Sequence, residues 1–395
     1  YGEEYSKGFF LRDLGYYFTL GEYADLAVRG GIYTLGSWEA SAASRYIKRY
    51  KYSGSFNMQY SNVKTGEKGE DDYIKQSNFR IQWTHSQDPK ANPGSTFSAS
   101  VNFATSGYSR YSATNLDDIL ATQTNSTISY SKNWAGTPFS LSANMAISQN
   151  SQNKTISITL PTMVFNVSRF YPFKRKHAAG NERWYEKISL SYTGQLSNSI
   201  STKEDRFMHS NLVKDWRNGF QHNIPLSGSF TLFNYLNVNP TFSFTDRMYT
   251  NKIDRSWDTA TQKEVCDTTY GFHNVYNWSA SISMSTKMYG FWIPSRKLFG
   301  DKIQAIRHVI TPTVSFSYAP DFGASRYGYW KTYQKTDADG NVSLVEYSPF
   351  SQGLYGVPGR GRTGNISFGL SNNLEMKVKS DKDSTGMKKI SLIDE

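Results

Sequence analysis

Apolar and polar side chains alternate along most of the chain. In residues 365–378, NISFGLSNNLEMKV, six even positions are apolar and the odd positions carry Asn, Ser, Gly, Glu and Lys. Side chains of a β-strand point alternately to opposite faces, so the pattern predicts a strand with one apolar and one polar face. With up to 14 residues, this strand is long, because strands of globular proteins average about 5 to 6 residues.

The same alternation recurs about 16 times, at intervals of roughly 20 to 25 residues, and no stretch has a convincing helical period. If residues 153–169 form one strand, the long connections all fall on one side of the sheet and the short ones on the other. The long ones are 106–121, 201–217, 250–270 and 320–361, and the short ones are 133–138, 234–236 and 380–386. Outer-membrane barrels alternate longer external loops with short periplasmic turns in this way.

Mean hydropathy is −0.59 and 38% of the residues are hydrophobic, and no segment approaches the roughly 20 apolar residues of a membrane helix. A helical membrane protein is therefore excluded. A barrel strand needs only about 9 to 11 residues with one apolar face. Aromatic residues near predicted strand ends fit interfacial girdles: Tyr16, Tyr17, Tyr50, Tyr52, Tyr171, Tyr289 and Trp292. We predict an all-β fold, a large antiparallel transmembrane β-barrel, with a soluble β-sandwich as the alternative.

The net charge of +11 suits a polyanionic partner, such as the phosphates of a glycolipid, but it is spread along the sequence. Nucleic acid is therefore not predicted as a partner. One basic stretch, YPFKRKHAAGNERWYEK, carries Lys174, Arg175 and Lys176 on the side of the short turns. These three are candidate contacts for an anionic glycolipid, and a solvated turn is the alternative.

Other motifs predict turns rather than chemistry. Gly359, Gly361 and Gly364 spell GxGxxG, but a strand follows them where a dinucleotide site needs a helix. Asp337 and Asp339 begin a calcium-loop pattern without its remaining ligands, and Asp339 and Gly340 instead predict a hairpin. No histidine spacing fits zinc. We predict no metal, no cofactor and no enzymatic activity.

Three stretches resemble a known family. IRHVITPTVSFSYAPDF (306–322), ITLPTMVFNVSRFYPFKRK (158–176) and NISFGLSNNLEMKVKSD (365–381) are similar to segments of the lipopolysaccharide-assembly outer-membrane family LptD, of the Bacteroidota type. The stretch from Gly8 to Gly54 is similar to the first barrel strands of that family. The resemblance covers the whole chain in order.

The resemblance implies a barrel of about 26 strands, which inserts lipopolysaccharide into the outer leaflet of the outer membrane through a polar lumen and a lateral seam. It also implies an LptE-like lipoprotein plug and a periplasmic lipopolysaccharide bridge that meets an N-terminal jellyroll. Since about 16 strands are predicted here, we expect residues 1–395 to be part of one barrel domain, with the jellyroll and the final strands outside the chain. Another large barrel, such as a porin, solute transporter or adhesin translocator, is the alternative.

The resemblance also assigns candidate residues. Five lie near the expected lateral gate: Phe9, Phe10, Leu14, Gly15 and Tyr16. The gate prolines of better-studied members are missing here, although a glycine also weakens a strand. Arg307, His308 and Pro312 are the family signature, and we expect structural roles for them. Cys266, the single cysteine, lies in a predicted loop and does not match the disulfides of those members.

Overall fold

The computed structural model describes the chain except residues 67, 70–72, 114–115, 117–119, 178–179, 181, 208, 296, 298–299, 301, 338–339, 380–386 and 395. Most of the described residues lie in β-strands. The helices α1 (Tyr108–Tyr111) and α3 (Glu204–Phe207) have four residues each. Within the described ranges, no helix has the length and apolarity needed to cross a membrane. The predicted all-β class is confirmed.

Nineteen strands form one antiparallel sheet, in which most strands pair with the next one along the chain. In chain order they are β1 (Gly2–Glu4), β2 (Gly8–Leu20), β3 (Ala24–Tyr33), β4 (Trp38–Lys48), β5 (Tyr52–Thr65), β6 (Ile74–Gln87), β7 (Ser95–Ala104), β8 (Gln123–Asn133), β9 (Phe139–Asn150), β10 (Thr155–Phe170), β11 (Ile188–Lys203), β12 (Arg217–Gly228), β13 (Phe230–Leu232), β14 (Leu236–Asp258), β15 (Lys263–Thr286), β16 (Met288–Trp292), β17 (Ile303–Ala319), β20 (Thr363–Lys379) and β21 (Met387–Asp394). Sixteen of these described strands have eight or more residues, which agrees with the expected number.

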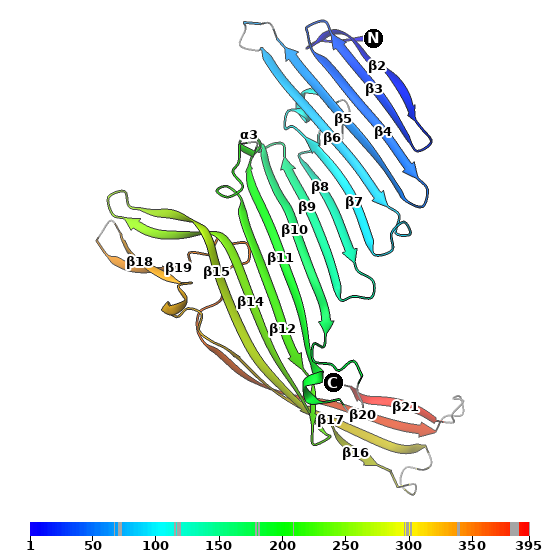
Figure 1. The fold of residues 1–395 in the computed structure, drawn as a ribbon, viewed down its shortest axis with the longest axis vertical. Helices are drawn as coiled ribbons and strands as arrows, with labels where there is room; N and C mark the ends of the chain where they lie inside the picture. The colour runs from blue at the N-terminus through cyan, green and yellow to red at the C-terminus, as the bar shows by residue number, and fades with distance from the viewer. Residues whose placement is uncertain are drawn as a thin grey trace.

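The sheet is a curved, twisted surface that runs from β2 at one extreme to β21 at the other (Figure 1). Within the described part of the chain, β21 pairs with β20, and β2 pairs with β1 and β3. No described pairing joins β21 to β2, so this part of the sheet is open. Closure into a barrel and a total of about 26 strands stay predictions.

The strand register gives the sheet two chemically different faces. One row of paired residues crosses five strands as Ser227, Thr241, Ser281, Ser317 and Asn365. The row one position along, on the opposite face, contains Leu226, Phe242, Ala280, Tyr318 and Gly364. The polar face and the apolar face therefore extend across neighbouring strands, as the alternation predicts.

Large side chains of the apolar face are strongly exposed. Phe316 is 45% exposed and Phe368 is 79% exposed. Near α3 the same face carries a buried cluster of Ile156, Ile158 and Ile200 with Trp216. A continuous exposed apolar surface of this kind needs another apolar phase or partner against it.

The four prolines inside strands lie where the hydrogen-bond ladder is interrupted. Pro161 lies in the β10 bulge between Thr159 and Thr162. The others lie opposite breaks: Pro225 where the β11 register skips, Pro240 beside the β12 to β13 break, and Pro312 beside the β15 to β16 break. Proline has no N–H to donate to a ladder, so these are the positions that tolerate it.

The predicted separation of long and short connections is confirmed for the described segments that are loops or turns. β10 is one strand, and the α1 and α3 segments lie at the opposite end of the sheet from the β8–β9 and β13–β14 turns. The predicted hairpin is β18 (Lys331–Thr336) with β19 (Val342–Tyr347), although Asp339 lies outside the described residues. The predicted turn at 380–386 also lies outside them.

One predicted loop is wrong. Residues 250–270 largely continue β14 and β15, whose ladder extends to the pair of Asp258 with Lys263. Cys266, predicted in a loop, therefore lies in β15, where it is paired with Arg255 and is exposed. The segment lacks clear apolar alternation because its ladder continues past the band of apolar residues.

A strand glycine allows one aromatic cluster to form. The ring of Tyr46 lies against Gly54, its partner in β5, and a Cβ at Gly54 would collide with that ring. The Tyr46 hydroxyl accepts a hydrogen bond from Trp83 Nε1 at 2.9 Å and lies 2.9 Å from His85 Nδ1.

We expect Gly54→Ala to displace the Tyr46 ring and to lower the free energy of unfolding by about 1 to 3 kcal/mol. The measurement is urea unfolding of the full-length protein in lipid vesicles. Gly364→Ala is the matched control, because a Cβ there would meet no atom within 4 Å. Equal midpoints for the two variants would contradict the role of Gly54.

Candidate functional site: the polar face and the sheet edges

The polar face is lined by hydroxyl and amide side chains that bond to one another across strands. The oxygens of Ser55 and Thr84 are 2.8 Å apart, and those of Ser157 and Ser201 are 2.9 Å apart. Each hydroxyl keeps capacity for a further hydrogen bond. This lining can therefore contact water or a hydrated solute over its whole length.

The segment between β17 and β20, residues 320–362, folds onto this polar face and is called the β17–β20 loop here. The Tyr249 hydroxyl donates to the carbonyl of Gly356 at 2.6 Å, and Arg247 Nε donates to the carbonyl of Tyr355 at 3.1 Å. The Tyr355 hydroxyl reaches the carbonyl of Gln195 at 3.1 Å, and burial raises the pKa of Tyr355 to about 12. The loop thus connects β11 and β14 across the polar face.

The β17–β20 loop has a folded core of its own. Phe322, Tyr329 and Phe350 are buried with Tyr249 and Val275 of the sheet. At its base, the Asp321 carboxylate accepts backbone N–H bonds from Gly323 and Gly361, which lower the pKa of Asp321. Gly361 therefore has a turn role, as the sequence predicts, and its φ of 86° requires glycine.

The segment that contains α1 folds onto the polar face near the other end of the sheet. Tyr108 is buried there and donates to Gln59, and the hydroxyls of Ser112 and Ser61 are 2.6 Å apart. Lys7 Nζ, in the β1–β2 turn, donates to the carbonyl of Tyr111 at 3.3 Å. This segment therefore connects the first strands to β5.

All five gate candidates lie in β2, the first long strand. Beyond Phe10, the outer edge of β2 pairs with no described strand. Leu14 is 56% exposed and Tyr16 is 70% exposed, and Phe9 is also exposed. Their position at an edge is what the gate hypothesis needs, and the gate role itself stays a prediction.

The β2–β3 ladder is irregular at the gate candidates. The register jumps between Leu11 and Leu14, and Asp13 has a φ of 64°, which is strained for a residue other than glycine. A Cβ at Gly15 would collide with the carbonyl oxygen of Val28 and lie 2.8 Å from Arg29 Cα, so the close approach of β3 requires glycine. A bulge and a glycine therefore interrupt the regular pairing of this strand at the gate candidates.

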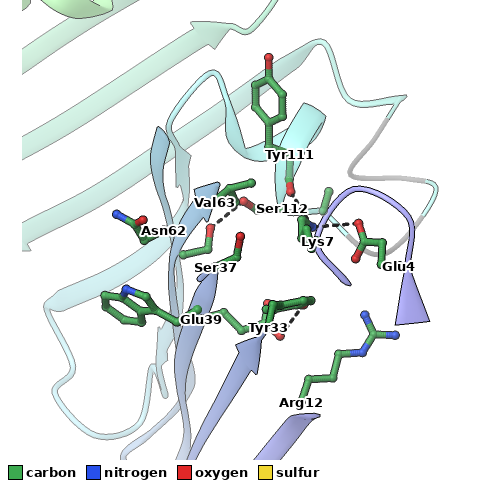
Figure 2. A pocket seen from close by; sticks show the side chains of 13 residues that line it. Glu4, Lys7, Arg12, Tyr33, Ser37, Glu39, Asn62, Val63, Tyr111 and Ser112 are labelled. Carbon is green, nitrogen blue, oxygen red and sulfur yellow. Dashed lines mark hydrogen bonds and ion pairs between the residues drawn. The ribbon is translucent and has the colours of Figure 1, made fainter. Parts of the chain in front are cut away.

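A polar cavity of about 240 Å³ lies behind this edge, between the β1–β2 turn and the α1 segment (Figure 2). Lys7 lies between Glu4, at 3.1 Å, and the carbonyl of Tyr111. The Tyr33 hydroxyl donates to Glu39 at 3.3 Å. With charges of both signs and several hydroxyls, the cavity can donate to and accept from a polyhydroxylated solute.

The family signature residues lie in β17. Arg307 Nη2 is 2.7 Å from Glu375 Oε2, and the two residues are paired across β17 and β20. His308 is on the apolar face with its Nε2 3.3 Å from Asn372 Oδ1. Pro312 lies beside a ladder break, as its expected structural role requires.

The basic turn contains an ion pair that sequence reasoning missed. Glu186, 1% exposed in its side chain, receives Arg175 Nε at 2.6 Å and the Arg183 backbone N–H at 2.6 Å. These donors lower the pKa of Glu186 to about 2. The sequence does contain a local signal for the contact with the Arg183 backbone, because Glu186 follows Arg183 by three residues at the start of a 3-10 turn.

The three anionic-contact candidates are not equivalent in this turn. Arg175 is bound to Glu186, and Lys174 lies 3.1 Å from exposed Glu182. No ion pair of Lys176 occurs among the described residues. Their contact with a glycolipid stays a prediction.

A single antiparallel sheet with an apolar and a polar face, and with loops folded onto the polar face, is typical of the wall of an outer-membrane barrel. The family model described as LptD protein matches residues 1–395, so the chain belongs to the LptD family. This family transports and assembles lipopolysaccharide at the outer membrane and is not a family of enzymes. The family resemblance seen in the sequence is confirmed.

Other comparisons add little. No curated protein matches the chain. Among solved structures, the chain is similar to a double mutant of the Serratia marcescens hemophore receptor HasR in complex with its hemophore HasA and heme, with 8% identity and a TM-score of 0.22. That match covers 93% of this chain and 61% of the receptor chain, so the chain spans less than two thirds of that protein.

Glu186 gives the basic turn a pH dependence. Its folded pKa of about 2 lies below the ordinary value of about 4.3, so its stabilising effect is present above that value and is lost as the pH falls toward 2. We expect pepsin to cut the wild-type turn progressively faster from about pH 4 to pH 2, relative to an unfolded substrate. Glu186→Gln should be cut readily throughout, and Glu182→Gln should behave as wild type. A wild-type profile for Glu186→Gln would contradict the role of this ion pair.

Arg247 holds the β17–β20 loop on the polar face. In Arg247→Gln, we expect trypsin to cut after Arg326 about tenfold faster or more, because charged hydrogen bonds to Tyr355 and Asn277 are lost. The measurement is limited proteolysis of the full-length protein in detergent, with Lys203→Gln, at the end of β11, as the control. Equal cutting rates in the two variants would show that the loop does not depend on Arg247.

Proposed function

We propose that this chain is part of a single transmembrane barrel domain that inserts lipopolysaccharide into the outer leaflet of the outer membrane. The observation that carries the proposal is one continuous sheet, in a member of the LptD family, with an exposed apolar face and a polar face opposite it. The apolar face would lie against lipid and the polar face would line the lumen. An N-terminal jellyroll and the final barrel strands would complete the protein outside this chain.

The two faces match the two parts of the substrate. Acyl chains of lipopolysaccharide have to reach lipid, and its phosphorylated sugars have to stay in a wet environment. A wall that is apolar outside and polar inside separates these parts without any bond being made or broken. The hydroxyl lining and the mixed charges behind β2 are suitable for hydrated sugars.

The proposed exit is at the β2 edge. Its bulge at Arg12 and Asp13 and the close approach at Gly15 reduce regular pairing there. A seam with few ladder bonds opens at lower cost than a complete ladder. Phe9, Phe10, Leu14, Gly15 and Tyr16 would form one side of this lateral gate, and a later strand would form the other.

The proposed partners follow from the family. An LptE-like lipoprotein would occupy the lumen, and a periplasmic lipopolysaccharide bridge would meet the jellyroll. Another outer-membrane barrel function, such as that of a porin or solute transporter, is the second candidate, since the two-faced sheet alone is common to all of them. Copurification of a tightly bound lipoprotein favours the first candidate.

Depletion of the full-length protein in its native cell tests the proposal. We expect newly made lipopolysaccharide to disappear from the cell surface and to accumulate at the inner membrane, with recovery when the wild-type gene is restored. The measurement is pulse-labelled lipopolysaccharide at the surface. Normal arrival at the surface would overturn the export proposal and favour a general transporter.

The gate is tested separately by photo-crosslinking in cells that export normally. A crosslinker at Leu14 should capture pulse-labelled lipopolysaccharide earlier than a crosslinker at Leu370, because the lipid would leave the protein at β2. Both side chains are exposed on the apolar face, but Leu370 lies in β20, where it is paired with Pro312 of β17. Simultaneous labelling at both positions would place the exit elsewhere.

A further inference from the structure

Positive charge that is spread along the sequence is gathered by the fold. The ends of β17, β20 and β21 on the side of the short turns lie next to one another, and five lysines are found there: Lys302, Lys377, Lys379, Lys388 and Lys389. The described acidic residue closest to them in register is Glu375. Among the described residues, this corner of the sheet therefore has an excess of positive charge.

Two of these lysines face each other. Lys377 of β20 and Lys389 of β21 are a directly opposed pair in the register. Cβ atoms in such pairs are about 4.5 to 5.5 Å apart, and like charges at that separation destabilise the pairing of the strands. Both side chains are exposed, and neither forms an ion pair with another described residue. The β20–β21 pairing therefore contains a repulsion that the described carboxylates do not neutralise.

The same two lysines line a cavity of about 340 Å³. Arg307 and Glu375 lie on its wall as a cross-strand pair with 2.7 Å between Nη2 and Oε2, and Phe291 of β16 closes one side. Three cations and one carboxylate thus line the space beside the apolar residues Phe291, Met376 and Met387, and the net charge of the lining is +2. Arg307 uses Nη2 for Glu375, while a guanidinium has five N–H donors in all.

We propose that this cavity binds a phosphate group. A guanidinium and two ammonium groups around a small space form the donor set that phosphate oxygens accept from most strongly. A bound phosphate would also neutralise the repulsion between Lys377 and Lys389 and would strengthen the β20–β21 pairing. The site thus couples an anionic ligand to the stability of this part of the sheet.

The phosphate has two possible carriers: a sugar phosphate, such as that of a glycolipid, or the headgroup of an anionic phospholipid. Arg307, Lys377 and Glu375 share the polar face, and Met376 of the apolar face also borders the cavity. This position favours a phosphate on a hydrophilic group. The site rests on its charge and geometry alone, whereas the choice of a glycolipid as carrier rests on the proposed function.

The test measures thermal unfolding of the full-length protein in detergent, with inorganic phosphate added at constant ionic strength. Phosphate should raise the unfolding temperature of the wild type. The double variant Lys377→Gln, Lys389→Gln should bind phosphate at least about tenfold more weakly. Its unfolding temperature without phosphate should equal or exceed that of the wild type, because the repulsion is removed. A residue with a merely structural role would lower that temperature.

Lys388→Gln is the matched control, because it removes the same charge one residue away on the opposite face, where Lys388 is paired with Val378. It should respond to phosphate as the wild type does. An equal rise in all three proteins, or no rise in any of them, would overturn the proposal.

Two further probes identify the carrier: glucosamine 1-phosphate, and nanodiscs of phosphatidylcholine with or without phosphatidylglycerol. If glucosamine 1-phosphate stabilises the wild type but not the double variant, the carrier is a sugar phosphate. If phosphatidylglycerol does so, the carrier is a bilayer headgroup. If neither probe stabilises the wild type more than the double variant, the proposed site is overturned. Because purified protein binds these probes without exporting anything, failure here is independent of the depletion experiment.

Discussion

The structure depends on one requirement, that each strand must satisfy its backbone hydrogen bonds through the strands beside it in the sheet. This pairing fixes the register, and the register places serines and threonines on one face and large apolar residues on the other. Where the hydrogen-bond ladder is interrupted, the backbone is accommodated in two ways. Prolines lie at gaps in the ladder, and beyond the last β7–β8 pair the side chains of Ser126 and Gln149 bond to the backbone of Asn102 and Ala104. Satisfying every backbone group is what an apolar surrounding demands.

How much the sequence predicts follows from the same requirement. Alternation with a period of two reports which residues face an apolar phase, so strands such as Phe139–Asn150 and Thr363–Lys379 are visible before folding is considered. The outer parts of β14 and β15 are polar on both faces and are held by their ladder, and therefore the sequence suggests a loop there. The hairpin of β18 and β19 is predicted because its turn chemistry is local.

Contacts across the polar face could not be predicted, because they join residues far apart in the chain. Arg247 meets Tyr355, and Tyr355 meets Gln195, through hydrogen bonds to carbonyl groups that leave no pattern in the sequence. Glu186 is intermediate, since its spacing from Arg183 is local but its partner Arg175 is brought to it by the turn. Family resemblance points to β2 as the gate strand, yet the bulge at Asp13 appears only in the backbone angles.

Charge is the property that folding rearranges most. In the sequence, the excess of basic residues is not concentrated in any segment. A spread charge of +11 indicates only solubility and weak attraction to anions. Antiparallel strands of similar length bring residues from distant turns to the same end of the sheet, so lysines of β20 and β21 lie beside Lys302 and Arg307. Opposed like charges weaken a strand pair, and the described carboxylate nearest to these lysines in register, Glu375, is already bound to Arg307. The proposed phosphate would complete the electrostatic balance of this corner and would make strand pairing and ligand binding parts of the same equilibrium.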